Sequence, residues 1–177
     1  SNHPAALLDE LMRVAAWQRV DLLTGLPETP HKFILAVHDP AEREAIVSSR
    51  PDLVVSWFWT RLLPAEVRRA GGRGTVGVHP SLLPRHRGPD PTSWAILLGD
   101  AETGVTAHVL DDAYDTGAVY AQRSLAIVPT WNAFDLARAL DRPSLALLRE
   151  VVAAFASGES PIATPQVAGG VTSAPML

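Results

Sequence analysis

The chain has 177 residues, a length that suits one domain with an adequate core. Apolar residues make up 47% and charged residues 19%, as is typical of a folded chain, and the net charge of −4 provides no general attraction to nucleic acid or to an anionic membrane. Because the sequence contains no cysteine, it excludes disulfides, thiolate nucleophiles and sulfur-ligated metal sites.

The N-terminal half shows helical and strand patterns in alternation. Apolar residues recur at helical spacing in the first element, and short apolar runs rich in branched residues predict the strands. Asp39 followed by Pro40 is typical of an N-cap and a first helical position. In chain order, the sequence predicts a helix at 4–23, a strand at 32–39, a helix at 41–50, a strand at 52–58, a helix at 63–70 and a strand at 74–79.

The C-terminal half continues this alternation. It predicts a helix at 92–100, a strand at 104–112, an antiparallel partner strand at 118–128 and a long helix at 131–158. Thr130 is the predicted N-cap of the long helix, and Pro143 predicts a break or kink inside it. Together the elements predict an α/β fold with a mainly parallel sheet flanked by helices, and with antiparallel strands towards the C-terminal half.

The sequence lacks the patterns typical of membrane, secreted, nucleotide-binding and metal-binding proteins. No apolar run reaches the roughly 18 residues that a membrane span requires, and the first residues lack the pattern of a signal peptide, so a cytoplasmic location is expected. Neither phosphate-binding glycine motif, GxGxxG or GxxxxGK[ST], is present. His3, His31 and His38 show no metal-ligand spacing, so no metal site is expected.

Two polar residues stand where strands are predicted to end. His79 closes the 74–79 strand, and Asp115 lies in the loop after the 104–112 strand. Open α/β sheets bind ligands at the carboxyl ends of parallel strands, and a carboxylate there can orient an imidazole and raise its proton affinity. A histidine at a strand end is also a common structural residue, and Asp-Thr-Gly is an ordinary turn. Position alone leaves both interpretations open.

The segments HPSLLPRHRGPDP and GDAETGVTAHVLDDAYDTGAVYAQ resemble the core of the folate-dependent formyltransferases, which include methionyl-tRNA, glycinamide ribonucleotide and sugar N-formyltransferases. The likeness extends back through RPDLVVSWFWTRLLPAEV and forward through DLARAL and TPQ to TSAPML, and covers residues 45–177. It implies a Rossmann-like catalytic domain at 1–160 and an extended segment or linker at 161–177. The family's opening strand has no clear counterpart before PAALLDELM, so we expect it to be absent or unrecognised.

The resemblance also implies catalytic positions. The family's pattern is Asn-x-His-Pro-Ser-Leu-Leu-Pro followed by Asp-x-Gly, in which the asparagine, histidine and aspartate are catalytic. His79 and Asp115 match the last two, whereas Gly77 stands at the asparagine position. In this chemistry an amine attacks the formyl carbon of 10-formyltetrahydrofolate. His79 would donate to the oxyanion or assist proton transfer, and Asp115 would hold the proton relay in place.

Gly77 leaves three explanations open. Another donor, such as Ser81, Arg85, His86 or a main-chain N–H, could hold the oxyanion. The protein could have lost transfer and kept folate binding, or the fold could run a related reaction. If only the donor is missing, Gly77→Asn should raise activity.

By resemblance, the pterin of the donor would lie against the backbone of two loops. The first loop comprises Thr60, Arg61, Leu62 and Leu63. The second comprises Asp111, Asp112, Ala113, Tyr114 and Asp115. The adjacent Trp57, Phe58 and Trp59 either wall this pocket or belong to the sheet core.

The acceptor side of the site is assigned to Ser81, Arg85 and Gly88. The basic loop at 85–87 either attracts an anionic substrate or is a solvated turn. The resemblance places His108 on the sheet and away from the site.

The function that this resemblance implies is formyl transfer from 10-formyltetrahydrofolate to the primary amine of a small molecule. Nucleic acid is expected as a partner only if the acceptor is a tRNA, and no membrane partner is expected. The alternatives are a catalytically impaired folate-binding or regulatory domain and a formyltetrahydrofolate hydrolase. The identity of the amine and the oligomeric state are not predicted.

Overall fold

The structure is a computed structural model that describes residues 40–157 and 161–177. The chain divides into two compact units, of which the first contains the residues up to Val55 together with Leu63–Thr75 and the second contains Ser56–Leu62 and Val76–Leu177. The following predictions lie outside the described residues: the helix at 4–23, the strand at 32–39, the Asp39 cap, and the spacing of His3, His31 and His38.

The described part of the first unit contains α3 (Pro40–Ser49) and α4 (Ala65–Arg68), at the positions where the sequence predicts helices. Ile46 and Val67 are almost completely buried in this unit. At its surface, the guanidinium of Arg43 donates to the carboxylate of Glu66 at 2.7 Å. Each of these two helices therefore buries an apolar side chain, and the ion pair between Arg43 and Glu66 connects them at the surface.

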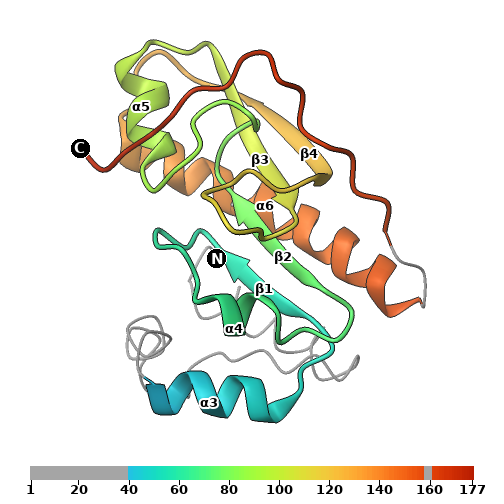
Figure 1. The fold of residues 1–177 in the computed structure, drawn as a ribbon. Helices are drawn as coiled ribbons and strands as arrows, with labels where there is room; N and C mark the ends of the chain where they lie inside the picture. The colour runs from blue at the N-terminus through green and yellow to red at the C-terminus, as the bar shows by residue number, and fades with distance from the viewer. Residues whose placement is uncertain (1–39, 158–160) are drawn as a thin grey trace. The chain divides into compact units, whose positions relative to one another are not determined.

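Four strands of the described residues form one mixed sheet in the order β1-β2-β3-β4 (Figure 1). Their bounds are Val54–Trp57, Thr75–His79, Glu102–His108 and Val119–Ala126. β1 and β2 are parallel, because the N–H of Val54 donates to the carbonyl of Gly74 and, further along both strands, Phe58 donates to Val78. The β2–β3 and β3–β4 pairs are antiparallel. The α/β class and the antiparallel C-terminal strands are confirmed.

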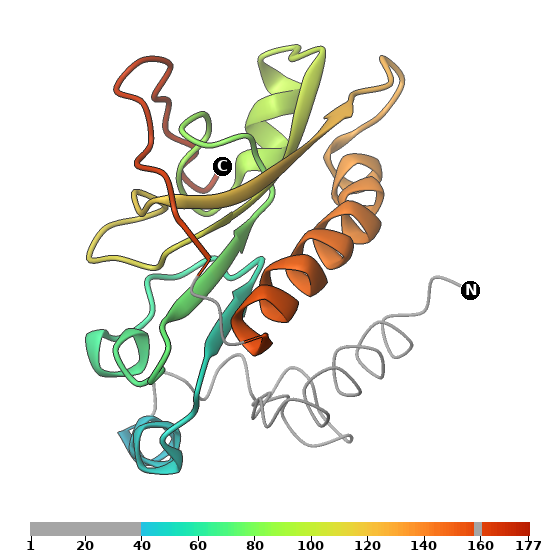
Figure 2. The same cartoon turned by 90° about the vertical axis from the view of Figure 1, so that its right-hand side faces the viewer.

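The long helix α6 (Ala133–Ala156) covers one face of β3 and β4 in the second unit (Figure 2). Its buried side is formed by Leu136, Leu140, Ser144, Leu145, Leu147, Leu148, Val151, Val152 and Phe155. The indole N–H of Trp57, at the end of β1, donates to the hydroxyl of Ser144 at 3.0 Å. The short helix α5 (Pro91–Leu97) also packs against α6. The long helix therefore closes the core of the second unit on this face.

The start of α6 differs from the sequence prediction. Its N-cap is Asn132, whose side-chain oxygen accepts the backbone N–H of Phe134 and Asp135, while the Asp135 carboxylate accepts the N–H of Asn132. The prediction of Thr130 as the cap is wrong, because this reciprocal pair satisfies the free donors of the first turn. The helix also continues through Pro143 without a break, since buried apolar side chains on both sides hold it.

Residues 161–177 are extended and cross the face of the sheet opposite α6 (Figures 1 and 2). Thr164 exchanges two backbone hydrogen bonds with Val119, both at 2.8 Å. Further along, the carbonyl of Thr172 accepts the N–H of Arg87 at 2.9 Å, and the N–H of Ala174 donates to the Arg87 carbonyl at 2.7 Å. This segment is therefore fixed to the second unit at two places.

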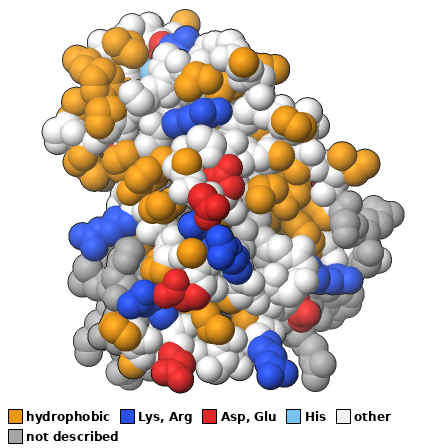
Figure 3. All heavy atoms as spheres, viewed as in Figure 1, with side chains coloured by type: hydrophobic (Ala, Val, Ile, Leu, Met, Phe, Trp, Pro, Cys, Tyr) orange, Lys and Arg blue, Asp and Glu red, His pale blue; other side chains and the backbone are white. Residues whose placement is uncertain are grey.

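Acidic, basic and apolar side chains are interspersed over the described surface that Figure 3 shows. Within residues 40–157 and 161–177, no helix has both the length and the apolar character that crossing a bilayer would demand.

Candidate functional site

His79 ends β2, and its side chain lies on the same face of the strand as position 77. The ring nitrogen Nε2 lies 2.8 Å from the carbonyl oxygen of His86. Because a carbonyl can only accept, Nε2 carries the proton of the neutral ring. The second nitrogen, Nδ1, lies 3.4 Å from Oδ2 of Asp115. The neutral imidazole therefore presents an unprotonated nitrogen to a carboxylate.

Asp115 lies in the loop between β3 and β4 and has a left-handed backbone, with φ 54°. Its Oδ2 accepts the backbone N–H of Gly88 at 2.8 Å. The prediction that both residues follow parallel strands holds for His79, which ends the β2 strand parallel to β1. It is wrong for Asp115, because β3, which precedes its loop, is antiparallel to both β2 and β4. The two side chains meet because the loop after β3 folds back towards the end of β2.

His108 joins these two residues, and the prediction that it lies away from the site is wrong. It is the cross-strand partner of Gly77, so its side chain emerges on the face that carries His79. The ring is 2% exposed, with Nδ1 2.8 Å from the carbonyl of Val109 and Nε2 3.4 Å from Oδ1 of Asp115. Two imidazoles therefore face one carboxylate.

Gly77 has no side chain at a place where His108 already fills the space. A Cβ atom at position 77 would lie 2.7 Å from Nε2 and 2.9 Å from Cε1 of His108, and 2.6 Å from Cδ2 of Leu110. The glycine therefore allows the imidazole of the neighbouring strand to approach the backbone of β2 closely.

The electrostatics of the site keep His79 neutral and Asp115 ionised near neutral pH. Burial lowers the pKa of His79 below 6.5, and this effect outweighs the nearby Asp115 charge, which raises it. Burial acts on Asp115 in the opposite sense, but contact with His108, the charges of both imidazoles and the Gly88 N–H together hold its pKa below 3.8. A neutral imidazole beside a carboxylate is suited to accept a proton.

We expect the free energy of unfolding to fall as the pH drops below 6.5, in part because of His79. The unfolded chain takes up a proton on this ring near pH 6.5, whereas the folded chain does so only at lower pH, so acid favours unfolding in this window. Urea unfolding at about pH 7.5 and about pH 5.5 measures the loss. His79→Gln should lose less stability between the two pH values, and an equal loss would contradict this role of His79.

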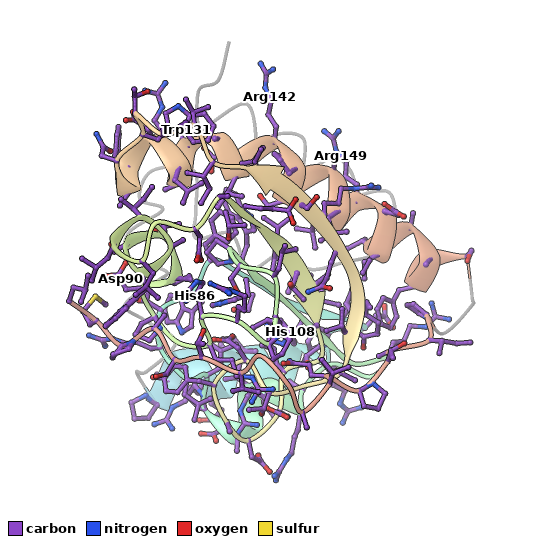
Figure 4. The ribbon with its side chains drawn as sticks, turned by 90° about the horizontal axis from the view of Figure 1, so that it is seen from above. His86, Asp90, His108, Trp131, Arg142 and Arg149 are labelled. Carbon is purple, nitrogen blue, oxygen red and sulfur yellow. The ribbon has the colours of Figure 1, made fainter. Side chains whose placement is uncertain are left out.

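The basic loop at 85–87 has partners inside the protein. The carboxylate of Asp100 accepts from a guanidinium nitrogen of Arg85 and lies 2.6 Å from Nε2 of His86. His86 is 2% exposed and has a left-handed backbone, with φ 55°. Arg87 donates twice to the side chain of Gln166. The solvated-turn interpretation is wrong for this loop, although the Arg85 side chain is 49% exposed. Figure 4 shows His86 and His108 on the side of the sheet opposite α6, where this loop lies.

Two of the residues assigned to the acceptor side have hydrogen-bond partners inside the protein. Ser81 is completely buried, and its hydroxyl donates to the carbonyl of Arg85 at 2.6 Å, so it stabilises the turn after β2. Gly88 uses its N–H for Asp115, and its positive φ of 121° places it against the carbonyl of Ala174. These two residues therefore position the loop, which leaves Arg85 as the assigned residue with an exposed side chain.

The two loops expected to hold the pterin meet in the second unit. The backbone N–H of Leu62 donates to the hydroxyl of Tyr114 at 3.1 Å. Thr60 and Arg61 are exposed beside Leu62, whereas Leu63 belongs to the first unit and is buried. The structure thus brings Leu62 of the first loop next to Tyr114 of the second.

The second of these loops is shaped by its own aspartate. The carboxylate of Asp111 accepts the hydroxyl of Thr116 at 2.6 Å and the N–H of Ala113 at 3.3 Å, which closes a turn. Asp112 and Ala113 are exposed at its tip. Among the adjacent aromatic residues, Trp57 fits the core interpretation, because its ring stacks on Phe58 with centroids 5.1 Å apart and its N–H is bonded to α6.

Within the described part of the chain, no group of three or more histidine, aspartate or glutamate side chains is arranged to hold a metal ion. The site brings the imidazoles of His79 and His108 to the carboxylate of Asp115, and such groups can bind and move protons.

Comparison with known proteins places this chain in a family. Residues 31–152 match the family described as formyl transferase. The chain is 39% identical over 139 residues to methionyl-tRNA formyltransferase of Myxococcus xanthus, covering 78% of this chain and 44% of that protein. It is 33% identical over 109 residues to GDP-perosamine N-formyltransferase of Brucella melitensis, covering 62% of this chain and 42% of that protein. The chain spans less than half the length of these curated relatives.

Solved structures agree with this placement. HypX from Aquifex aeolicus in complex with tetrahydrofolic acid matches with a TM-score of 0.65 and 26% identity, covering 76% of this chain and 24% of that one. Structures of formyltransferases share the Rossmann-like α/β fold of this chain. The chain belongs to the formyl transferase family.

Proposed function

We propose that the protein transfers a formyl group from 10-formyltetrahydrofolate to the primary amine of a small molecule. The observation that carries this proposal is the approach of Nδ1 of the buried His79 to the carboxylate of Asp115 at 3.4 Å. Attack by an amine on a formyl carbon releases a proton from nitrogen and builds negative charge on oxygen. A site for this reaction needs a proton acceptor and a group that stabilises the protonated acceptor.

His79 and Asp115 fill these two roles in the proposal. Nδ1 of the neutral His79 accepts the proton, since Nε2 is already protonated and bonded to the carbonyl of His86. The imidazolium then lies beside the ionised Asp115, which the N–H of Gly88 keeps in place. The proton can return from His79 to the departing nitrogen of the donor.

His108 is the proposed substitute for a side chain at position 77. Its ring occupies the space over Gly77, and Nε2 points to the same region as Asp115. Because Nδ1 is bonded to the carbonyl of Val109, Nε2 becomes a donor when the ring carries a second proton. In that form His108 can stabilise negative charge on the formyl oxygen.

The loop residues fit a folate donor. The backbone N–H of Leu62 reaches the hydroxyl of Tyr114, so the two segments that would hold the pterin already lie against each other. The donor supplies the activated formyl group, and the HypX structure with tetrahydrofolic acid supports a folate in this family. The exposed Thr60 and Arg61 leave this edge accessible.

A small-molecule acceptor is favoured by three observations. A sugar N-formyltransferase is among the relatives, and the half-exposed guanidinium of Arg85 can attract an anionic group such as the phosphate of a nucleotide-linked sugar. The net charge of −4 offers no general attraction to a tRNA backbone.

The test is to incubate the protein with 10-formyltetrahydrofolate and a set of amines that includes nucleotide-linked amino sugars and methionyl-tRNA, and to detect formylated product by mass spectrometry. The expected result is a formylated amino sugar whose appearance depends on the folate. Product on methionyl-tRNA alone would contradict the small-molecule acceptor. Formate release without an amine would indicate a hydrolase, and folate binding without any reaction would indicate an impaired binding domain.

A further inference from the structure

Every hydrogen-bonding position of the Gln166 side-chain amide is used. Nε2 donates to the carbonyl of Asp115 at 2.7 Å and to that of Gly117 at 2.8 Å. Oε1 accepts from Nε and Nη2 of Arg87 at 3.1 and 2.6 Å. Two donors and two acceptor positions are the full capacity of an amide. The orientation of the amide is therefore fixed. If it were flipped, its NH2 group would face the N–H donors of the Arg87 guanidinium, and its oxygen would face the carbonyl oxygens of Asp115 and Gly117.

The backbone holds Gln166 at this place from both sides. Thr164, shortly before it, exchanges two hydrogen bonds with Val119 at the start of β4. Ala174, after it, is completely buried and bonded through its N–H to the carbonyl of Arg87. The side-chain amide of Gln166 is therefore held between the β3–β4 loop and the loop after β2.

The partners of Gln166 are the two loops that carry the proposed catalytic pair. Arg87 lies between His86, whose carbonyl orients His79, and Gly88, whose N–H holds the Asp115 carboxylate. On the other side, Gln166 bonds to the backbone carbonyl of Asp115, whose left-handed conformation requires external support. A single side chain thus connects the supports of both reacting groups.

We propose that Gln166 is a positioning residue that sets the distance between His79 and Asp115. The role rests on the proposed function, in which His79 passes a proton beside Asp115. Gln166 itself touches neither reacting group through its side chain, and acts on the backbone of Asp115 and on the loop that orients His79.

Two substitutions separate this role from simple packing. Gln166→Glu keeps an acceptor for Arg87 but sets a carboxylate oxygen against the carbonyls of Asp115 and Gly117. Gln166→Met keeps the length and volume of the side chain and removes all four hydrogen bonds. Val167→Ala, at a neighbouring side chain that is 68% exposed, is the matched control.

The experiment compares kcat, KM for donor and amine, and melting temperature in the full chain carrying each substitution. We expect kcat to fall about ten- to a hundredfold in Gln166→Glu and Gln166→Met, because small displacements of reacting groups cost rates of this order. KM should change little, and Val167→Ala should match the wild type. A loss of kcat that only follows the fraction of unfolded protein in both variants would overturn the proposal.

The second readout is independent of turnover. Nitrogen NMR of labelled histidine reports the environment of the His79 ring, which should change in both Gln166 variants and stay unchanged in Val167→Ala. If the wild type shows no formyl transfer, the proposed function fails, and this spectrum still decides the positioning role. An unchanged His79 signal in a folded Gln166→Glu protein would overturn it.

Discussion

Replacing Asp115 by asparagine is expected to slow formyl transfer by about 10²- to 10⁴-fold while the protein stays folded. Asparagine keeps the shape of the side chain and can still accept the N–H of Gly88. It lacks the negative charge that stabilises a protonated His79 at Nδ1. Steady-state kinetics with folate donor and amine acceptor measure the loss, which should appear mainly in kcat.

Glu150→Gln is the matched control, since it also removes one carboxylate. Glu150 forms an exposed ion pair with Arg123, and such surface pairs contribute little to stability. Its kinetics should equal those of the wild type. If Asp115→Asn were as active as Glu150→Gln, the proton-transfer role of Asp115 would be refuted.

Gly77→Asn alone is expected to destabilise the protein by about 1–3 kcal/mol and to reduce activity, because it overfills a packed region. The sequence predicts the opposite outcome, a gain of activity from a restored donor, for the case in which only that donor is missing. The new Cβ would approach His108 within 2.7 Å, and this ring cannot move away without leaving the carbonyl of Val109 and the carboxylate of Asp115. Urea unfolding and transfer kinetics of the purified variant test both effects.

A paired substitution distinguishes the steric explanation. Gly77→Asn should cost less stability in a His108→Ala background than in the wild type, because removal of the ring eliminates two of the three close contacts of the new Cβ and leaves only the one with the flexible end of Leu110. Non-additivity of this kind is expected only for residues in contact. A stable and more active Gly77→Asn single variant would show that His108 does not occupy this space in solution.

The order of helices and strands in the described residues was predictable because each element has a clear apolar pattern. β2 and β4 lie within a residue or two of the predicted 74–79 and 118–128. β3 ends at His108 and not at 112, because the chain turns away after an irregularity in its pairing with β4 at Ala107 and His108. Alternation of polar and apolar residues gives a strand, but the point where the ladder stops depends on the partner strand.

The candidate site was predictable in its two polar residues and not in the third. His79 and Asp115 were found through strand ends and a family resemblance, and the structure brings them together. His108 was missed because its proximity depends on the register that pairs it with Gly77. A glycine inside a strand was the available signal, since it often marks a close approach by another group.

Capping was missed for a related reason. Asn132 and Asp135 form the Asn-x-x-Asp version of a capping pair, and this pattern is present in the sequence two residues after Thr130. The role of Ser81 in the turn after β2 could not be predicted, because it depends on where the backbone carbonyl of Arg85 lies in space, and the order of residues along the chain does not give that position.

The left-handed backbone of Phe58, His86 and Asp115, each in the stretch that follows one of the first three strands, has a practical consequence for protein engineering. Glycine would adopt these conformations with less backbone strain. A substitution to glycine would therefore relieve that strain, but it would also remove the side chain. At His86 and Asp115 that side chain is hydrogen-bonded within the site. Programmes to raise thermal tolerance should therefore leave these positions alone and work on the outer surface of α6, from which Arg142 and Arg149 extend (Figure 4).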